Sequence, residues 1–266
     1  MTVHASDIAS SVAGQSDNRS ANGGYFELGA TVYSVNKIDI RQTEHEAVTP
    51  SLLISGVYQY EGLFVETVHQ SQDGINLGYN FWNSKNWSLD LLLANLKIIL
   101  VRSEEIDITS LDETERNNYL MSEESLYVGA GFRATRYWDN DYVFQYRITT
   151  DYYDSQGLQS SARLGKSWQV KNWNFHALAS VEYSSAKFNR RLFGISRQEA
   201  TKLYPQYQPG SAINYGVEFG VAYPISQSIV FRALYRFNHI SNEISNSPFI
   251  EANYVSFFNA SVSYVF

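Results

Sequence analysis

Alternation of apolar and polar residues dominates the chain and predicts β-strands that each have one apolar face. In Ile213–Tyr223 the odd positions carry Ile, Tyr, Val and Phe, whereas the even positions carry Asn, Gly, Glu and Ala. The stretches 173–183 and 229–237 alternate in the same way, and so does the last stretch, which ends at Phe266. Successive side chains of a strand point to opposite faces, so a period of two places each apolar set on one face.

The two faces differ in a way that is typical of a membrane barrel. The apolar face is rich in aromatic residues, and the chain contains 20 Tyr and 15 Phe. The opposite face carries Gly, Ser, Asn and charged residues. A soluble β-protein also alternates, with its polar face in water. A barrel with lipid outside and a polar lumen accounts better for both faces, and it is compatible with a mean hydropathy of −0.29.

The pattern predicts an all-β fold, a single closed transmembrane antiparallel β-barrel over residues 24–266. About twelve strands are expected, at 24–34, 50–60, 62–70, 74–83, 86–101, 125–137, 141–153, 157–168, 173–186, 212–224, 228–240 and 252–266. The pattern is ambiguous in 62–70 and irregular in 86–101, where Asp90, Asn95 and Lys97 interrupt an apolar run.

The connections between these strands alternate between short and long. Short turns are expected near Glu61 and at 83–86, 138–140, 169–172 and 225–227, and long segments at 35–49, 102–124, 187–211 and 241–251. Bacterial barrels have short periplasmic turns and long extracellular loops, and an even number of strands returns both termini to the periplasm. The sequence therefore predicts a location in the outer membrane of a Gram-negative cell.

The five tryptophans support this orientation, because they all flank predicted short turns. They are Trp82, Trp87, Trp138, Trp168 and Trp173. Aromatic side chains gather at the membrane–water interface, so these residues are expected to form an aromatic girdle at the periplasmic side.

Composition excludes other classes of protein. The chain has no apolar run of 18 residues, which excludes a spanning helix. The net charge of −7 argues against nucleic acid as a partner, and the absence of Cys fits an oxidising envelope compartment. Residues 1–23 lack the basic start and apolar core of a signal peptide. We expect them to be a mobile polar segment, with export specified by a segment that this chain lacks.

Strand parity predicts a charge network inside the lumen. The inward set comprises Glu27, Arg133, Arg147, Asp151, Arg163, Glu182, Glu218, Arg232 and Arg236. One interpretation is structural, because charges in a narrow lumen must be paired. The other is a selective pore, in which charged side chains set ion preference. The structural interpretation is favoured. His176 is expected to be a hydrogen-bonded lumen residue.

Two long loops carry clustered charge. The loop 102–124 is acidic, with Glu104, Glu105, Asp107, Asp112, Glu113, Glu115, Glu123 and Glu124. It lacks the spacing of a calcium loop and is expected to be solvated, as is His45 elsewhere. The loop 187–211 is basic, with Arg190, Arg191, Arg197 and Lys202. In it, Ser196 and Glu199 predict a capping box for a short helix through Leu203. Packing of the loop is the favoured interpretation, and a lid or a phosphate contact with lipopolysaccharide is the alternative.

A hydrolase is the alternative function of a different class. His239 and Ser241 lie two apart, so on a strand they would share the outward face, and His could act as the base for a Ser nucleophile. Asn253 or Glu251 could orient the His. This arrangement resembles that of outer-membrane phospholipase A and lipid A deacylase. Against it, Asn253 has inward parity. Metal-ligand clusters and phosphate-binding loops are absent from the sequence, so no cofactor or metal is expected.

The last part of the chain resembles a known family. Residues 193–224, with Phe193-Gly194-Ile195-Ser196 followed by an EA, a Pro-x-Tyr-x-Pro-Gly and a Tyr-Pro motif, are similar to the MipA/OmpV (MltA-interacting protein) family. So is the ending from Ile244 through Asn246-Ser247-Pro248 to Phe266, with Asn246 in place of the usual Asp. The resemblance implies an outer-membrane protein in contact with lipid and lipopolysaccharide. For some members it implies a scaffold between a murein transglycosylase and a murein synthase, and for others adhesion. It brings no catalytic residues.

Overall fold

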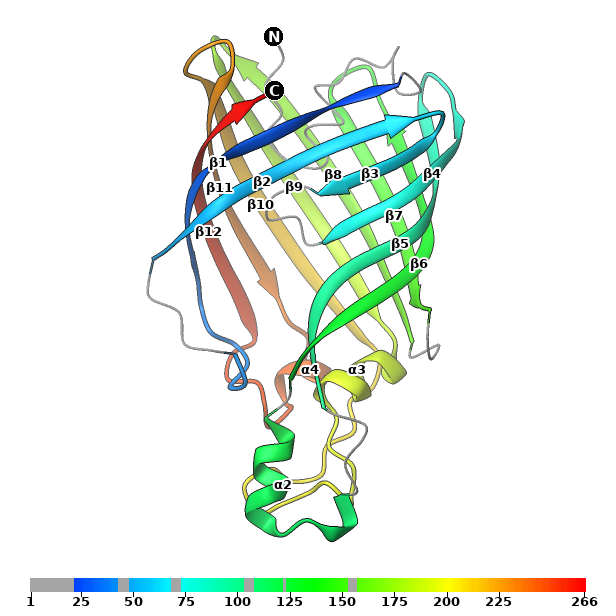
Figure 1. Ribbon diagram of the computed structural model, residues 1–266, viewed down its shortest axis with the longest axis vertical. Coiled ribbons are helices and arrows are strands. Elements are labelled where there is room, and N and C mark those ends of the chain that lie inside the picture. The colour runs from blue at the N-terminus through cyan, green and yellow to red at the C-terminus, as the bar shows by residue number, and fades with distance from the viewer. Residues whose placement is uncertain (1–21, 43–47, 68–72, 103–107, 122, 153–156) are drawn as a thin grey trace.

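The chain folds into one closed antiparallel barrel of twelve strands, as the alternation predicts (Figure 1). The computed structural model describes residues 22–42, 48–67, 73–102, 108–121, 123–152 and 157–266. The strands are β1 (Gly23–Val35), β2 (Thr49–Tyr60), β3 (Leu63–Thr67), β4 (Ile75–Asn83), β5 (Trp87–Val101), β6 (Glu123–Tyr137), β7 (Tyr142–Asp151), β8 (Leu158–Val170), β9 (Trp173–Ser184), β10 (Ala212–Pro224), β11 (Ile229–His239) and β12 (Tyr254–Val265). The predicted mobile segment 1–23 lies outside the described residues, except for residues 22 and 23.

The barrel closes between its first and last strands. Each strand pairs with its neighbour in sequence, and β1 pairs with β12 from Glu27 opposite Val265 to Val35 opposite Phe257. Closure leaves no free sheet edge at this seam, which a spanning structure requires because lipid offers no hydrogen-bond partners.

The apolar face of each strand points outward. In β10, Ile213, Tyr215 and Phe219 are exposed, whereas Glu218 between them is buried. Side chains that are exposed on the surface of an isolated barrel are those that lipid would cover, so the outer surface is apolar where it meets the membrane. The polar side chains of the same strands point into the interior. This distribution of polar and apolar side chains is the inverse of that in a soluble protein.

Two irregularities explain why β5 alternates poorly in sequence. The pairing of β5 with β6 shifts between Leu92 and Asn95, and that of β4 with β5 shifts between Leu77 and Gly78. Asp90 and Leu92 are buried before the shift and Asn95 after it, so the inward parity changes from even to odd along the strand. An extra residue in one strand of a pair is a β-bulge, and it reverses which side chains face the lumen.

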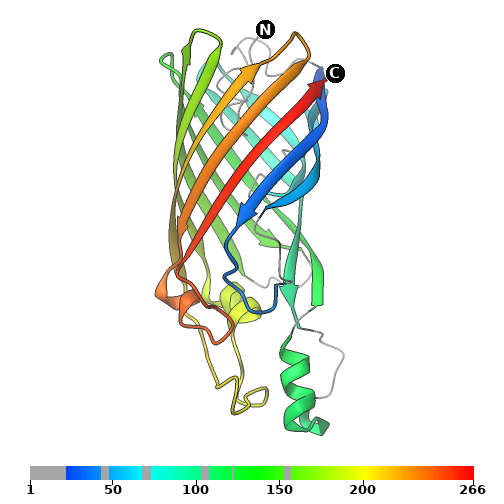
Figure 2. The same cartoon turned by 90° about the vertical axis from the view of Figure 1, so that its left-hand side faces the viewer.

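The short turns, the start of β1 and the end of β12 lie at one end of the barrel, and the long connections lie at the other (Figures 1 and 2). Three of the tight turns contain non-glycine residues with positive φ, namely Glu61, Asp141 and Lys171. The long connections contain helices that the sequence pattern did not predict: η2 (Ile108–Ser110), α2 (Glu113–Leu120), α3 (Ala186–Phe193) and α4 (Asn242–Ser245). The predicted strand 173–186 therefore ends at Ser184, because Ser185 caps α3.

The long connections pack together into an ordered extension of the barrel, here called the platform: α2, residues 195–204 and residues 247–250. Its core is formed by Leu120, Ile195 and Phe249, which are fully buried. Thr201 Oγ1 donates to Asn117 Oδ1 at 2.7 Å and ties the second segment to α2. The platform projects past the strands at the end opposite the termini (Figure 2).

Candidate functional site: the lumen and its mouth

Ion pairs fill the side of the lumen lined by β3 to β8. The Arg133 guanidinium lies 2.8 Å from Asp90 and 2.5 Å from Glu66. Asp73, from the connection between β3 and β4, lies 2.9 Å from Arg147 and 2.6 Å from Arg163. These side chains are at least nine-tenths buried. Arg133 is paired in register with Asp90 on the neighbouring strand. Glu66 and Asp73 instead reach their arginines from β3 and from the turn before β4, so the network also joins elements that are not neighbours in the sheet.

A second set of pairs lies on the side of β1 and β9 to β12. Glu27 accepts from both terminal nitrogens of Arg232, at 2.7 and 2.9 Å, and from the Ser263 hydroxyl at 3.0 Å. Glu218 lies 2.5 Å from Arg236 and 3.0 Å from His176 Nε2. A bidentate Arg–carboxylate pair is among the stronger charge-assisted interactions, and it fixes the side chains against each other.

The structure places the residues of the predicted network inside the barrel. Six are buried: Glu27, Arg133, Arg147, Asp151, Arg163 and Glu218. Arg232 and Arg236 are mostly buried, and Glu182 is 35% exposed at 3.7 Å from Arg163. Asp151 is paired with Arg191 of α3 at 2.8 Å. His176 lies among them, bonded to Glu218.

Sequence reasoning missed three of the carboxylates in this network: Glu66, Asp73 and Asp90. Glu66 lies on a strand where Leu63, Phe64 and Val65 hide the alternation. Asp73 lies in a turn, where parity has no meaning. For Asp90 a signal existed, because it interrupts an apolar run on a strand, as Asn95 and Lys97 do, and a polar residue there indicates the lumen.

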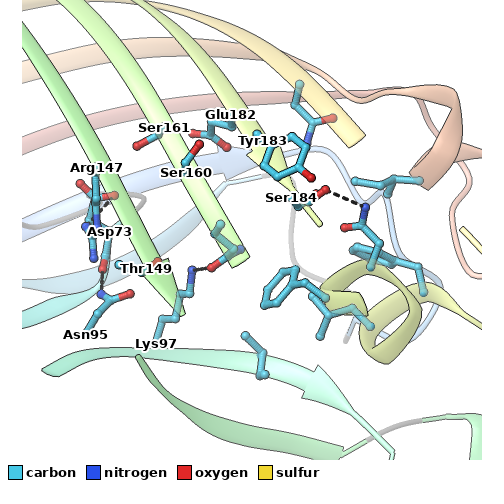
Figure 3. Close-up of a pocket in the computed structure, with 18 of the residues that line it drawn as sticks. Asp73, Asn95, Lys97, Arg147, Thr149, Ser160, Ser161, Glu182, Tyr183 and Ser184 are labelled. Atoms are coloured by element: carbon cyan, nitrogen blue, oxygen red, sulfur yellow. Dashed lines mark hydrogen bonds and ion pairs between the residues drawn. The ribbon is translucent and has the colours of Figure 1, made fainter. Parts of the chain in front are cut away.

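A cavity of about 280 Å³ remains between this network and α3 (Figure 3). Asp73, Lys97, Arg147 and Glu182 line it, together with the hydroxyls of β8 and β9. The Lys97 ammonium lies in the cavity wall and donates to Gln159 Oε1 at 2.6 Å. The cavity is polar and large enough for several waters.

Helix α3 packs against the barrel wall at the mouth of the lumen, next to this cavity. Its buried side chains Phe188 and Leu192 pack on Val101 and Tyr127 of the barrel wall, and the Phe188 and Tyr127 rings meet edge to face at 6.1 Å. Asn189 Nδ2 donates to the Gly210 carbonyl at 2.8 Å, and Arg41 Nη1 donates to the Leu192 carbonyl at 3.0 Å. Strands, loops and helix are therefore held together at the extracellular end.

The predicted girdle lies at the end with the short turns. Trp82, Trp138, Trp168 and Trp173 are exposed and Trp87 is half-buried. The Arg136 guanidinium lies over the rings of Trp87 and Trp138, at 5.1 and 5.2 Å from their centroids. Amphipathic rings with adjacent cations are suited to the membrane interface.

The residues of the hydrolase alternative do not form a triad. β11 ends at His239, which is exposed, and Ser241 starts α4 instead of sharing the strand face with it. Ser241 Oγ is buried without a hydrogen-bond partner among the described residues. Asn253 accepts from the Ile240 backbone through its carbonyl, and within the described part of the chain no hydrogen bond joins these side chains. The expectation of a shared outward parity was wrong because the strand is shorter than its pattern.

The capping box in loop 187–211 forms, but the helix that it predicted does not. Ser196 N donates to Glu199 Oε2 at 2.6 Å and Glu199 N donates to Ser196 Oγ at 3.3 Å. The chain then makes a turn, because Thr201 N bonds to the Tyr204 carbonyl instead of continuing a helix to Leu203. The other carboxylate oxygen of Glu199 is paired with Arg102, at 2.8 Å.

The acidic loop is only partly described. Asp112 and Glu115 form a reciprocal capping box at the start of α2, and Glu113 accepts from Lys202 N at 3.1 Å. Glu104, Glu105 and Asp107 lie outside the described residues, as do the side chains of Glu123 and Glu124, and His45. In the described ranges, no group of three or more acidic or His side chains has the arrangement of a metal site. No helix in those ranges is both long and apolar enough to cross a bilayer.

Closure, an apolar outer face, ion-paired contents and alternating turn lengths together define an outer-membrane β-barrel. The sequence model of MltA-interacting protein MipA matches residues 28–266. The chain therefore belongs to the MltA-interacting protein MipA family.

One similar protein is named as an outer membrane protein. Outer membrane protein Omp26La of Vibrio anguillarum is 27% identical over 88 residues. That match covers 33% of this chain and 34% of Omp26La, about a third of its length.

Among solved structures, OmpT, an outer membrane protein of Vibrio cholerae, is 7% identical with a TM-score of 0.44, covering 91% of this chain and 98% of OmpT. The toluene transporter TodX of P. putida is 12% identical with a TM-score of 0.39, covering 97% and 93%.

Proposed function

We propose that this outer-membrane barrel is a non-enzymatic interaction protein of the cell envelope, and that its binding surface is the platform at the extracellular end. The observation that carries the proposal is the packing of the platform. Three connections converge on a buried core of Leu120, Ile195 and Phe249, whereas a solvated loop would need no such core. Loops held on a rigid scaffold are the usual place for binding residues.

The contents of the lumen support an interaction role over a pore. Glu27, Asp73 and Glu218 each lie within 3.0 Å of a cation, so few charges remain to select a passing ion. Helix α3 packs at the mouth with Phe188 and Leu192 on the wall, which supports a narrowed lumen. A paired network and a narrowed mouth are what a structural filling requires.

A murein enzyme as partner is a less well supported version of the same role. A periplasmic partner would meet the short turns and residues 1–23, of which the structure describes two. The short turns alone offer less surface than a standard interface, which buries about 800 Å² on each side. The platform is accordingly the better candidate for docking, and adhesion to a surface outside the cell is the activity that it would serve.

The test compares two variants in cells that lack the native protein. Leu120→Asp introduces a charge into the core of the platform, and Ile225→Asp makes the same change at an exposed position in a short turn at the other end. We expect Leu120→Asp to reduce adhesion of the cells to a host-cell monolayer at least tenfold and Ile225→Asp to leave it unchanged. Both barrels should keep heat-modifiable mobility in gels.

The murein-enzyme version is tested in parallel by deleting residues 2–22 and measuring co-purification with a murein transglycosylase and a murein synthase. If the deletion abolishes co-purification and adhesion does not depend on Leu120, the binding surface is the N-terminal segment and not the platform. If neither variant changes either readout, the interaction role is wrong.

The lipid esterase alternative has its own test. We expect no release of fatty acid from phospholipid or lipopolysaccharide by the purified barrel, and no difference between the native chain and Ser241→Ala. If the native chain releases fatty acid and Ser241→Ala abolishes that release, the protein is an enzyme and the proposed interaction role is wrong.

A further inference from the structure

A second cavity, of about 350 Å³, lies where the end of β5, α2 and α3 meet. Its lining is strongly basic in a chain whose net charge is −7. Arg102, Lys187, Arg190 and Arg191 contribute to it, with Glu199 as the acidic member and Tyr119 and Val101 as the walls. The ion pairs described above engage Arg102 and Arg191, and they leave Lys187 and Arg190 without a carboxylate among the described residues.

Two of the cations in this cavity keep hydrogen-bond donors that nothing in the described residues satisfies. Arg102 Nε is bonded to Glu199 at 2.8 Å, but its Nη1 is buried and has no partner. Arg191 Nη1 is bonded to Asp151 at 2.8 Å, but its Nε is buried and has no partner. A buried charged donor is strongly favoured to bind an acceptor that enters the cavity, so these two donors are suited to an anionic group.

The other two cations are available to the same acceptor. Lys187 and Arg190 are exposed on α3, and neither side chain forms an ion pair with any described residue. Among the described residues, four cations and one carboxylate, Glu199, therefore line the cavity, and Asp151 beside it is paired with Arg191. The excess positive charge matches a phosphate monoester, which carries about two negative charges and three acceptor oxygens.

We propose that this cavity is a binding site for a phosphate group at the extracellular mouth of the barrel. The buried guanidinium donors of Arg102 and Arg191 would bind the phosphate oxygens, and Lys187 and Arg190 would cover the group from α3. A carboxylate has two oxygens for these donors and matches the charge less well. The proposal does not depend on the docking role of the platform, because the site is complete without a protein partner.

The test uses the full-length barrel in phosphatidylcholine nanodiscs, with two double variants that each remove two charges. Lys187→Gln with Arg190→Gln changes the cavity, and Arg197→Gln with Lys202→Gln changes exposed cations of the same loop outside it. Binding of inorganic phosphate is measured by calorimetry. Binding of lipid A is measured with nanodiscs that contain lipid A or its dephosphorylated form. Heat-modifiable mobility checks folding of each variant.

We expect saturable binding of at least one phosphate source to the native chain, weakened about tenfold for each charge-assisted hydrogen bond lost in the cavity variant. The control variant should bind as the native chain does. Saturation by inorganic phosphate indicates a soluble ligand, whereas binding of lipid A that dephosphorylation abolishes indicates a lipid headgroup. Failure of both probes to bind would overturn the proposal, as would equal losses in the two variants.

Discussion

At the scale of single residues, the buried carboxylates of the lumen are paired with cations. Taking an ion out of water costs several kcal/mol, so a carboxylate such as Glu27 is tolerated in the lumen because Arg232 holds it with two hydrogen bonds. An exposed pair such as Lys85 with Asp139, 3.6 Å apart, is screened by solvent and contributes little. The two kinds of pair should respond differently to mutation.

Removing one partner of the Glu27–Arg232 pair should be far more costly than removing both. Arg232→Leu leaves Glu27 buried without its cation, and we expect a loss of about 3–5 kcal/mol in the free energy of unfolding. Arg232→Leu with Glu27→Leu should recover most of that loss, since no buried charge remains. Urea unfolding of the barrel in lipid vesicles measures both. As a control, Lys85→Leu should change stability by less than about 1 kcal/mol; equal effects at the two pairs would refute the account.

At the scale of elements, the strands follow the sequence pattern closely and the helices do not. Period-two alternation specifies β10 at both ends, because its outer face must be apolar along its whole length. Helix α3 was missed because the alternation continues through Tyr183 and Ser185 into its cap. A signal was present: Phe188 and Leu192 lie four residues apart on one helix face, after a Ser that can cap.

The cap of α3 should control how firmly the helix packs at the mouth. Ser185 Oγ accepts from Leu158 N at 2.9 Å and from Phe188 N at 3.4 Å. We expect Ser185→Ala to destabilise the helix by about 1 kcal/mol. Hydrogen exchange of the amides in Ala186–Phe193 should then become faster by about fivefold, while amides of β10 stay unchanged. Exchange in α3 that does not respond would show that packing of Phe188, and not the cap, holds the helix.

At the scale of the whole molecule, the wall of the barrel could be predicted from the sequence and its contents could be predicted in part. Parity placed residues such as Arg133 and Glu218 inside, because strand neighbours determine the face on which a side chain lies. It could not place Asp73, which reaches Arg147 and Arg163 from a turn, or the platform, whose core joins Leu120, Ile195 and Phe249. Contacts between distant connections depend on packing that no local period encodes.

Closure of the lumen is the central claim, because it decides between an interaction protein and a pore. Single-channel recording in planar bilayers tests it most directly, with a general porin as the positive control. We expect no steady conductance from the native chain, and none from Arg232→Gln with Arg236→Gln, since α3 and the network of Asp73 remain in place. A steady current whose ion preference changes in that double variant would contradict closure and show a selective pore.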